Sequence, residues 1–208
     1  MEENQAHIDR LVRNTQRGNT QAFGELYDLY FERVYKYVSY KVSDEHIDDL
    51  VSTIFVKAWT KIKKYKKSKF PFKSWLFRIA HNSIIDHYRT NKTIYELEER
   101  VADNNRHFDP KDILEKSLSG ERVHRALREL DKKYQEVIIL KFMNELENKE
   151  IAHILNTNEG NIRTLQFRAL KKLRIILETE EREAEQELAL RSRKKASTGF
   201  FKKLFARS

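Results

Sequence analysis

The chain has 208 residues, 41 Lys and Arg against 32 Asp and Glu, a net charge of +9 and no cysteine. This length fits one or two domains, the absence of cysteine excludes disulfides and thiolate metal sites, and the charge favours an anionic partner such as nucleic acid or a membrane surface. Helical periodicity fills most of the chain and only five Gly and two Pro interrupt it, which predicts an all-α, cytoplasmic protein. The polar N-terminus lacks the pattern of a secretory signal, and the longest aliphatic run, residues 137–140, is too short to span a bilayer.

The first block, residues 1–92, is predicted to hold three helices with wide apolar faces. Apolar side chains recur at steps of three and four in residues 23–38 and again in residues 47–62. A third helix is predicted to follow Pro71 and to run to about Arg89. Three such helices are sufficient for a small bundle, which makes this block the first of two small helical domains.

A run of lysines with aromatic rings among them connects the second predicted helix to the third. Six lysines fall within residues 61–69. Stabilising an opened DNA strand requires cations for the backbone and flat apolar faces for unstacked bases, and this run offers both. The candidate residues for contact with the opened strand are Tyr65, Lys66, Lys67, Lys69, Phe70 and Phe72. Core packing is the alternative for the three rings, and the neighbouring Trp75 is expected in the core.

The third predicted helix carries a polar stripe on one face. Arg78, Asn82, Asp86 and Arg89 follow one another at steps of four, four and three. Such a stripe can lie along DNA, with the Asn82 amide able to donate to and accept from a base edge. Asp86 either reads an amino group or pairs with Arg89.

Residues 93–120 carry polar runs that predict a flexible linker, and residues 121–177 form a second block. Within this block, residues 148–155 predict a short amphipathic helix, a polar turn follows, and residues 159–174 predict a basic helix with five bases and one acid. This order is typical of a helix-turn-helix, whose second helix enters the major groove. An ordinary helical hairpin is the alternative, but the charge of the second helix favours DNA binding.

Other kinds of chemistry find no support in the sequence. None of the seven histidines has another histidine four residues away, and there is no HExxH, GxSxG or glycine-rich phosphate loop. Asp48 and Asp49 are adjacent on a helix, so their carboxylates diverge by about 100° and do not share a substrate. We therefore expect no enzymatic activity, no cofactor and no metal.

Three stretches together resemble a known family. HIDDLVSTIFVKAW (residues 46–59), FPFKSWLFRIAHNSIIDHYR (residues 70–89) and residues 127–173 are similar to bacterial RNA polymerase sigma factors of the extracytoplasmic-function (ECF) type. The resemblance implies a first domain that binds polymerase and opens the minus-10 element, and a second that reads the minus-35 element. The polymerase contacts that it implies are Asp48, Asp49, Ser52, Thr53 and Val56. The family often has a Gln and an acidic residue where Ser52 and Thr53 stand.

The same resemblance assigns DNA-facing positions and partners. The minus-35 contacts that it implies are Asn158, Asn161, Arg163, Thr164, Phe167, Arg168 and Lys171. Leu165 stands where the family commonly has another basic residue. It places Arg78, Asn82 and Asp86 at the minus-10 surface. The expected partners are core RNA polymerase (β′ clamp and β flap), promoter DNA in double- and single-stranded form, and an anti-sigma factor; membrane association is not expected. The alternative function is a helix-turn-helix regulator that acts without polymerase.

Residues 178–208 lie beyond the resemblance. Residues 178–187 hold six acids and one Arg, which predicts a solvated extension of the last helix, and residues 191–207 hold seven bases and no acid. Phe200, Phe201, Leu204 and Phe205 share one helical face. The segment is interpreted either as a disordered basic tail that adds nonspecific DNA affinity or as a short amphipathic element that docks on a partner.

Overall fold

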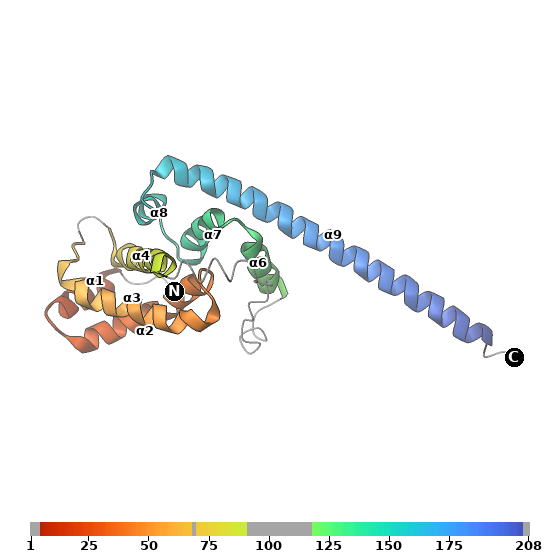
Figure 1. The fold of residues 1–208 in the computed structure, drawn as a ribbon, viewed down its shortest axis with the longest axis horizontal. Helices are drawn as coiled ribbons and strands as arrows, with labels where there is room; N and C mark the ends of the chain where they lie inside the picture. Colours follow the sequence, from red (N-terminus) through yellow and green to blue (C-terminus); the bar gives the residue numbers. More distant parts are fainter. Residues whose placement is uncertain (1–4, 68–69, 91–117, 206–208) are drawn as a thin grey trace.

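The computed structural model describes residues 5–67, 70–90 and 118–205, and within these ranges the chain is helical without strands. Figure 1 shows α1 to α4 forming one bundle, α7 and α8 lying beside α4, and α9 projecting away from the rest. The predicted all-α fold with two helical blocks is confirmed. The expected flexible linker falls mainly on residues 91–117, which lie outside the described residues.

The first block consists of α1 Gln5–Gln16, α2 Thr20–Ser39, α3 Ile47–Lys61 and α4 Phe72–Thr90. Short 3₁₀ turns, Asp44–His46 and Ile62–Lys64, lie on either side of α3. The last three helices match the predicted ones, whereas α1 was not predicted. Its buried residues Ile8, Leu11 and Val12 follow the same spacing of three and four, and α1 packs against α2.

Aromatic side chains fill the core of the first block. Tyr30, Tyr37, Phe72 and Phe77 are all fully buried. The rings of Tyr30 and Phe72 have centroids 5.6 Å apart, and those of Tyr37 and Phe77 meet edge to face at 5.5 Å. Aromatic pairs at these distances add to the stabilisation that comes from burying the ring area.

The second block consists of α6 Leu118–Glu129, α7 Lys132–Ile138, a π-helical turn Ile139–Met143, α8 Asn148–Ile154 and α9 Glu159–Phe205. Leu127, Leu130, Tyr134, Ile138 and Ala169 form a small core between α6, α7 and α9. Helix α6 begins at residue 118, two residues before the predicted end of the linker at residue 120. The helix-turn-helix pair is α8 and the first turns of α9, as the sequence predicted.

The two blocks share one hydrophobic core. The main cluster of buried side chains continues from the first block into the second, where it includes Val137, Ile139, Leu140, Leu146 and Ile151. Helix α4 packs against α8, and α2 contacts the π-helical turn. The blocks are therefore docked face to face rather than held only by their linker.

Helix α9 contains 47 residues, which corresponds to about 70 Å at 1.5 Å per residue. Residues 178–187 extend the last helix, and Glu181, Arg182 and Glu183 are exposed, whereas Glu180 is half-buried. Glu180 lies 3.6 Å from Arg125 Nε and Glu181 lies 3.9 Å from Arg122 Nη1, so two of the acids pair with α6. The backbone is helical as far as Phe205, whereas the side chains from residue 187 on lie outside the described residues, so the apolar patch stays a prediction.

Phe72 and Phe167 differ strongly in how far their side chains are buried. Phe72 is 2 % exposed and packs among Tyr30, Tyr65 and Trp75, whereas Phe167 on α9 is 72 % exposed. We expect Phe72→Ala to lower the free energy of unfolding by about 3–5 kcal/mol, because it leaves a cavity. Phe167→Ala should change it by less than about 0.5 kcal/mol. Urea denaturation followed by circular dichroism measures both, and equal effects would contradict the assignment of Phe72 to the core.

Candidate nucleic-acid and polymerase interface

The side chains expected to contact polymerase form one exposed face of α3. Asp48, Asp49, Ser52, Thr53 and Val56 are all exposed, while Leu50, Val51 and Ile54 on the opposite face are buried. Val56 is 62 % exposed, an unusual position for a valine on a helix that otherwise buries its aliphatic side chains. The face therefore offers two carboxylates and an apolar centre to a partner.

Helix α1 holds the lysine-rich loop in place. The Gln16 side-chain amide donates to the carbonyl oxygens of Ile62, at 3.0 Å, and Tyr65, at 2.9 Å. Lys67 pairs with Asp9, which is buried in α1. Sequence reasoning missed Gln16 and Asp9, although the apolar spacing of residues 8–12 could have revealed the helix that carries them.

The three rings of the loop have different environments. Tyr65 and Phe72 are 8 % and 2 % exposed and belong to the core, so for these two rings the core alternative is the observed one. Burial, together with the charge of Asp9, raises the pKa of Tyr65 to about 12, and its hydroxyl donates to the Phe70 carbonyl at 2.9 Å. Only Phe70 is partly exposed.

Phe70 lines a cavity of about 250 Å³ together with Lys64, Tyr65, Lys66, Trp75 and His153. Lys66 and Lys67 are exposed beside it, and Lys69 lies outside the described residues. The loop thus combines one partly exposed ring, which stacks on the His153 imidazole with centroids 3.9 Å apart, with several cations at its rim. Trp75 is half-buried and its ring centroid is 5.2 Å from that of Tyr65, which agrees with its expected packing role.

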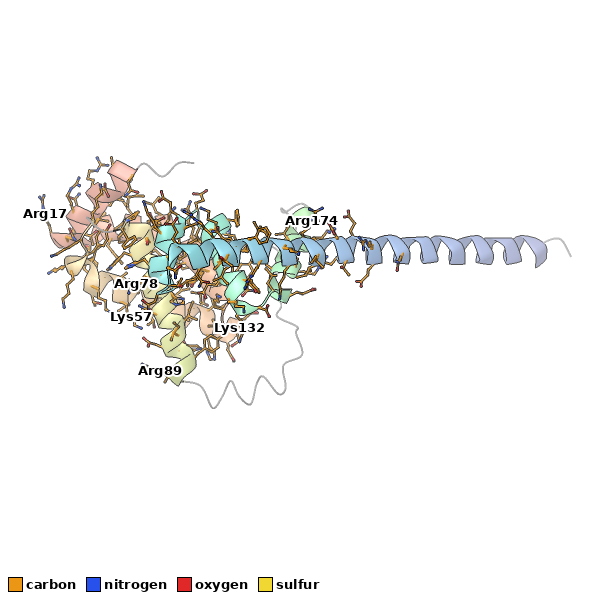
Figure 2. The ribbon with its side chains drawn as sticks, turned by 90° about the horizontal axis from the view of Figure 1, so that it is seen from above. Arg17, Lys57, Arg78, Arg89, Lys132 and Arg174 are labelled. Atoms are coloured by element: carbon orange, nitrogen blue, oxygen red, sulfur yellow. The ribbon has the colours of Figure 1, made fainter. Side chains whose placement is uncertain are left out.

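The polar stripe of α4 is present, and its carboxylate is already paired. Asp86 lies 3.3 Å from Arg89 Nη2 and 3.6 Å from Lys57 Nζ of α3. Asn82 is exposed, whereas Arg78 is half-buried. The Nη1 atom of Arg78 lies 2.5 Å from Nε2 and 2.8 Å from Nδ1 of the His153 imidazole. Figure 2 shows Lys57, Arg78 and Arg89 along one edge of the molecule. Because Asp86 is paired with two basic side chains, this edge of the molecule remains cationic around its carboxylate.

The helix-turn-helix is held by side-chain amides. The turn passes through Asn156, which has a positive φ of 52°, and Asn158 Oδ1 accepts from the backbone N–H of Asn161 at 2.8 Å. Gln166 Nε2 donates to Asn148 Oδ1 at 2.9 Å, which fixes α9 against α8. Asparagine tolerates the left-handed conformation better than most residues and caps helices well. Asn156 and Asn158 therefore both favour the turn that the structure shows.

All of the predicted minus-35 residues lie on the exposed side of α9. Asn158, Asn161, Arg163, Thr164, Phe167, Arg168 and Lys171 are exposed, and Ile162 and Ala169 are buried on the opposite side. Arg163 pairs with Glu159 at 2.6 Å, so the edge of a DNA base must compete with the Glu159 carboxylate for the Arg163 guanidinium. Leu165 is half-buried against the core, which explains why an apolar residue stands there.

Two features are absent from the residues that the structure describes. No group of three or more His, Cys, Asp or Glu side chains is arranged to hold a metal ion. No helix in the described ranges is long and apolar enough to cross a membrane.

Comparison with known proteins agrees with the arrangement of the two blocks. The sigma-70 region 2 family matches residues 26–94, and the sigma-70 region 4 family matches residues 120–173. The ECF RNA polymerase sigma factor SigM of Bacillus subtilis is 30% identical over 162 residues, which cover 73% of this chain and 93% of SigM. The ECF sigma factor BldN of Streptomyces coelicolor is 34% identical over 175 residues, which cover 83% of this chain and 66% of BldN.

The chain belongs to the ECF sigma factors of the sigma-70 family. It is therefore a subunit that associates with RNA polymerase and directs promoter-specific transcription initiation. The structure of CnrH in complex with the cytosolic domain of CnrY has a TM-score of 0.62 and 26% identity, and the match covers 83% of this chain and 98% of that one. The sigma factor RpoE of Bartonella quintana, solved with the anti-sigma factor NepR, shares the fold with a TM-score of 0.66 and 22% identity, over 76% of this chain and 98% of that one.

In this sigma factor a buried carboxylate joins the two blocks. Glu136 of α7 accepts a hydrogen bond from the Tyr37 hydroxyl at 2.7 Å and lies 2.8 Å from His81 Nδ1 and 3.6 Å from Lys41 Nζ. Burial alone raises the pKa of Glu136, but the hydrogen bond from His81, the charge of Lys41 and the Tyr37 hydroxyl together lower it to about 2. Its three partners all belong to the first block, so the interaction exists only while the blocks are docked.

The lowered pKa of Glu136 predicts an acid-sensitive part of the stability. The pKa falls from an ordinary 4.5 to about 2 on folding, so the stabilisation is complete above about pH 5 and is lost as the pH falls toward 2. The difference corresponds to a free energy on the order of 3 kcal/mol. Glu136→Gln should lower the free energy of unfolding at pH 7, and the gap to the wild type should shrink on acidification.

Urea denaturation across this pH range measures the effect. The exposed Glu183 provides a matched control, because Glu183→Gln removes the same charge away from the docked surface and should follow the wild type. A Glu136→Gln variant with wild-type stability at pH 7 would contradict the role given to the buried carboxylate.

Proposed function

We propose that this sigma factor divides its task among three surfaces. The exposed face of α3 (residues 48–56) contacts core polymerase, the exposed side of α9 (residues 158–171) reads the minus-35 element, and the lysine loop with the α4 stripe stabilises the opened minus-10 element. The observation that carries the proposal is the exposure of all the described candidate residues on α3 and α9, on faces opposite to buried apolar side chains. An amphipathic helix presents its polar face for binding because the other face is committed to the core.

The proposal extends to the partners and the mode of action. The sigma factor acts in the cytoplasm by binding alone, without catalytic residues of its own, and the binding free energy drives the deformation and opening of the duplex. An anti-sigma factor is a further candidate partner, since the sigma factor RpoE of Bartonella quintana, which shares this fold, was solved with the anti-sigma factor NepR.

The reading of the minus-35 element can be tested at Arg163. Guanidinium groups on a recognition helix read guanine edges with two hydrogen bonds, and losing such a contact costs about 1–3 kcal/mol. We expect Arg163→Ala to weaken binding of the holoenzyme to its cognate promoter by this amount and to relax the base preference at one position. Electrophoretic mobility shifts on a library of promoter variants measure both effects.

Arg174 provides a matched control for this experiment. It lies on the same helix, is exposed and forms the same kind of ion pair, with Glu178 at 2.7 Å, but is outside the proposed reading surface. Arg174→Ala should leave the base preference unchanged. If Arg163→Ala only makes the salt dependence shallower, Arg163 is a phosphate contact and not a base reader.

The opening of the minus-10 element can be tested at Phe70, and we withdraw Phe72 from this role because it is buried. Stacking of a freed base on an aromatic ring is worth about 1–3 kcal/mol and is gained only after the strands separate. Phe70→Ala should therefore bind core polymerase and duplex promoter normally but form fewer open complexes. Permanganate footprinting on a promoter recognised by the wild-type holoenzyme measures opening.

A promoter with a pre-opened bubble supplies the decisive comparison. The bubble should restore much of the activity of Phe70→Ala, because the unfavourable melting step has been removed. Phe142, an exposed ring on the π-helical turn, is the control, and Phe142→Ala should affect duplex and bubble templates equally. If the bubble does not rescue Phe70→Ala, the ring is structural and the strand-opening role is wrong.

A further inference from the structure

Helix α1 is attached to the lysine loop at two points. The Gln16 side-chain amide donates to the carbonyl oxygens of Ile62, at 3.0 Å, and of Tyr65, at 2.9 Å. Lys67 forms an ion pair with the buried carboxylate of Asp9. The partners in these contacts are 46 to 58 positions apart in the chain, so α1 supports the loop from outside it.

Tyr65 connects α1 to the ring that is proposed to stack on a base. The Tyr65 carbonyl oxygen accepts from Gln16, and the Tyr65 hydroxyl donates to the Phe70 carbonyl at 2.9 Å. The Tyr65 ring is buried, and its centroid lies 5.2 Å from that of Trp75. Because Tyr65 is held both at its backbone and at its hydroxyl, the position of the Phe70 backbone depends on α1.

Lys66 and Lys67 are neighbours on the loop but differ in how their charges are balanced. Lys67 is paired with Asp9, whereas no described residue forms an ion pair with Lys66. Burial raises the pKa of Asp9, but hydrogen bonds from Lys67 and Gln5 and the charges of Lys67 and Arg13 outweigh burial and lower it. The Asp9 carboxylate is therefore charged at neutral pH, and it compensates the charge of Lys67 from within the protein.

We propose that α1 belongs to the strand-opening machinery of this sigma factor. Gln16 and Asp9 are positioning residues that hold the loop in the shape in which Phe70 stacks on a base. Lys67 is the partner of Asp9 and not a contact for a phosphate, a role that is left to Lys66. The inference rests on the proposed strand-binding role of Phe70 and deepens it with residues that lie outside the loop.

Support from α1 matters because a loop loses conformational entropy when it becomes ordered. The contacts of Gln16 and Asp9 are made within the protein, so the loop is ordered when the chain folds and not when the strand binds. Losing these contacts removes no group that touches DNA. It makes the opened state less favourable, because the strand must then order the loop itself.

Asp9→Asn separates positioning from simple electrostatics. Removing a carboxylate beside a DNA-binding loop makes the protein more positive, and by charge alone this strengthens binding to a polyanion. If Asp9 positions the loop, the variant should instead form about three- to tenfold fewer open complexes, because a misplaced ring loses part of a base stack. Permanganate footprinting of the holoenzyme on a promoter recognised by the wild type measures this.

Asp28→Asn is the matched control, because it removes the same charge from an exposed position on α2, outside the contacts of the loop. It should form open complexes as the wild type does. If Asp9→Asn forms as many open complexes as the wild type, or more, the positioning role is wrong.

The dependence of binding on salt decides the role of Lys67. Each phosphate of a single strand that a lysine neutralises adds about 0.7 to the slope of log affinity against log salt concentration. Lys66→Met should lower this slope by that amount when the holoenzyme binds a promoter with a pre-opened bubble. Lys67→Met should leave the slope unchanged and still reduce opening of the duplex promoter. A shallower slope for Lys67→Met would show that Lys67 leaves Asp9 for a phosphate, which overturns the inference.

Lys67 also offers variants that test the pair without disturbing the core, since its side chain is exposed. Lys67→Arg keeps a cation for Asp9 and should open promoters as the wild type does. Asp9→Asn combined with Lys67→Met should open promoters no worse than either variant alone, because both break the same pair.

Gln16 is tested in the same way through the ring that it positions. Gln16→Ala should reduce opening on its own but add little to the loss caused by Phe70→Ala, because Gln16 acts through Phe70. Losses that add fully, in this pair or in the pair of Asp9 and Lys67, would indicate general destabilisation and overturn the inference.

Failure of the inference can be told apart from failure of the proposed function. If Phe70→Ala impairs opening of a duplex promoter but Asp9→Asn and Gln16→Ala do not, the strand-binding role holds and the positioning role of α1 is wrong. If Phe70→Ala has no effect in the holoenzyme, the strand-binding role itself is wrong, and the inference falls with it.

Discussion

The arrangement of this sigma factor depends on a carboxylate that neither block could bury alone. Glu136 leaves water when the blocks dock, and a buried carboxylate is costly unless donors and cations surround it. Tyr37, His81 and Lys41 supply them from the opposite block. Burial also lowers the pKa of Lys41, an effect that Glu136 partly offsets, so each charge makes the other tolerable. A purely apolar surface could slide, whereas this set of donors fixes one relative orientation.

The two surfaces proposed to contact DNA, the exposed side of α9 and the lysine loop, differ in how their side chains are held in place. The reading side of α9 is a rigid, exposed helix whose side chains are aligned by its own backbone. The lysine loop has no such frame, and its shape depends on Gln16 and Asp9 in α1. Reading a duplex needs a preformed helix, while holding a flexible strand needs a supported loop with accessible rings.

Much of this could be predicted from the sequence, because helical periodicity is a local property. The spacing of apolar residues identified α2, α3 and α4. The family resemblance supplied Arg163 and Arg168, which the structure places on the exposed side of α9, opposite the buried Ile162 and Ala169. The pairing of Asp86 with Arg89, one of the two alternatives that the sequence left open, is also local and is present in the structure. These features depend only on residues within one or two helical turns.

What could not be predicted depends on residues far apart in the chain. Nothing near Glu136 indicates that Tyr37, 99 positions earlier, donates to it, and nothing near Phe70 indicates that His153 covers it. The burial of Phe72 likewise follows from its contact with Tyr30 in another helix. The aromatic–lysine pattern gave the right loop but could not decide which ring faces inward, because that choice is made by packing across helices.

The length of α9 has a mechanical consequence. The residues proposed to read the minus-35 element and the backbone near Phe205 belong to one uninterrupted helix of about 70 Å. A helix of this length is rarely straight but curves only gently. The pairs of Arg122 with Glu181 and of Arg125 with Glu180 hold the middle of this helix against α6, so a displacement of its far end tilts it about that point. The turns proposed to read the minus-35 element belong to the same helix and move with it.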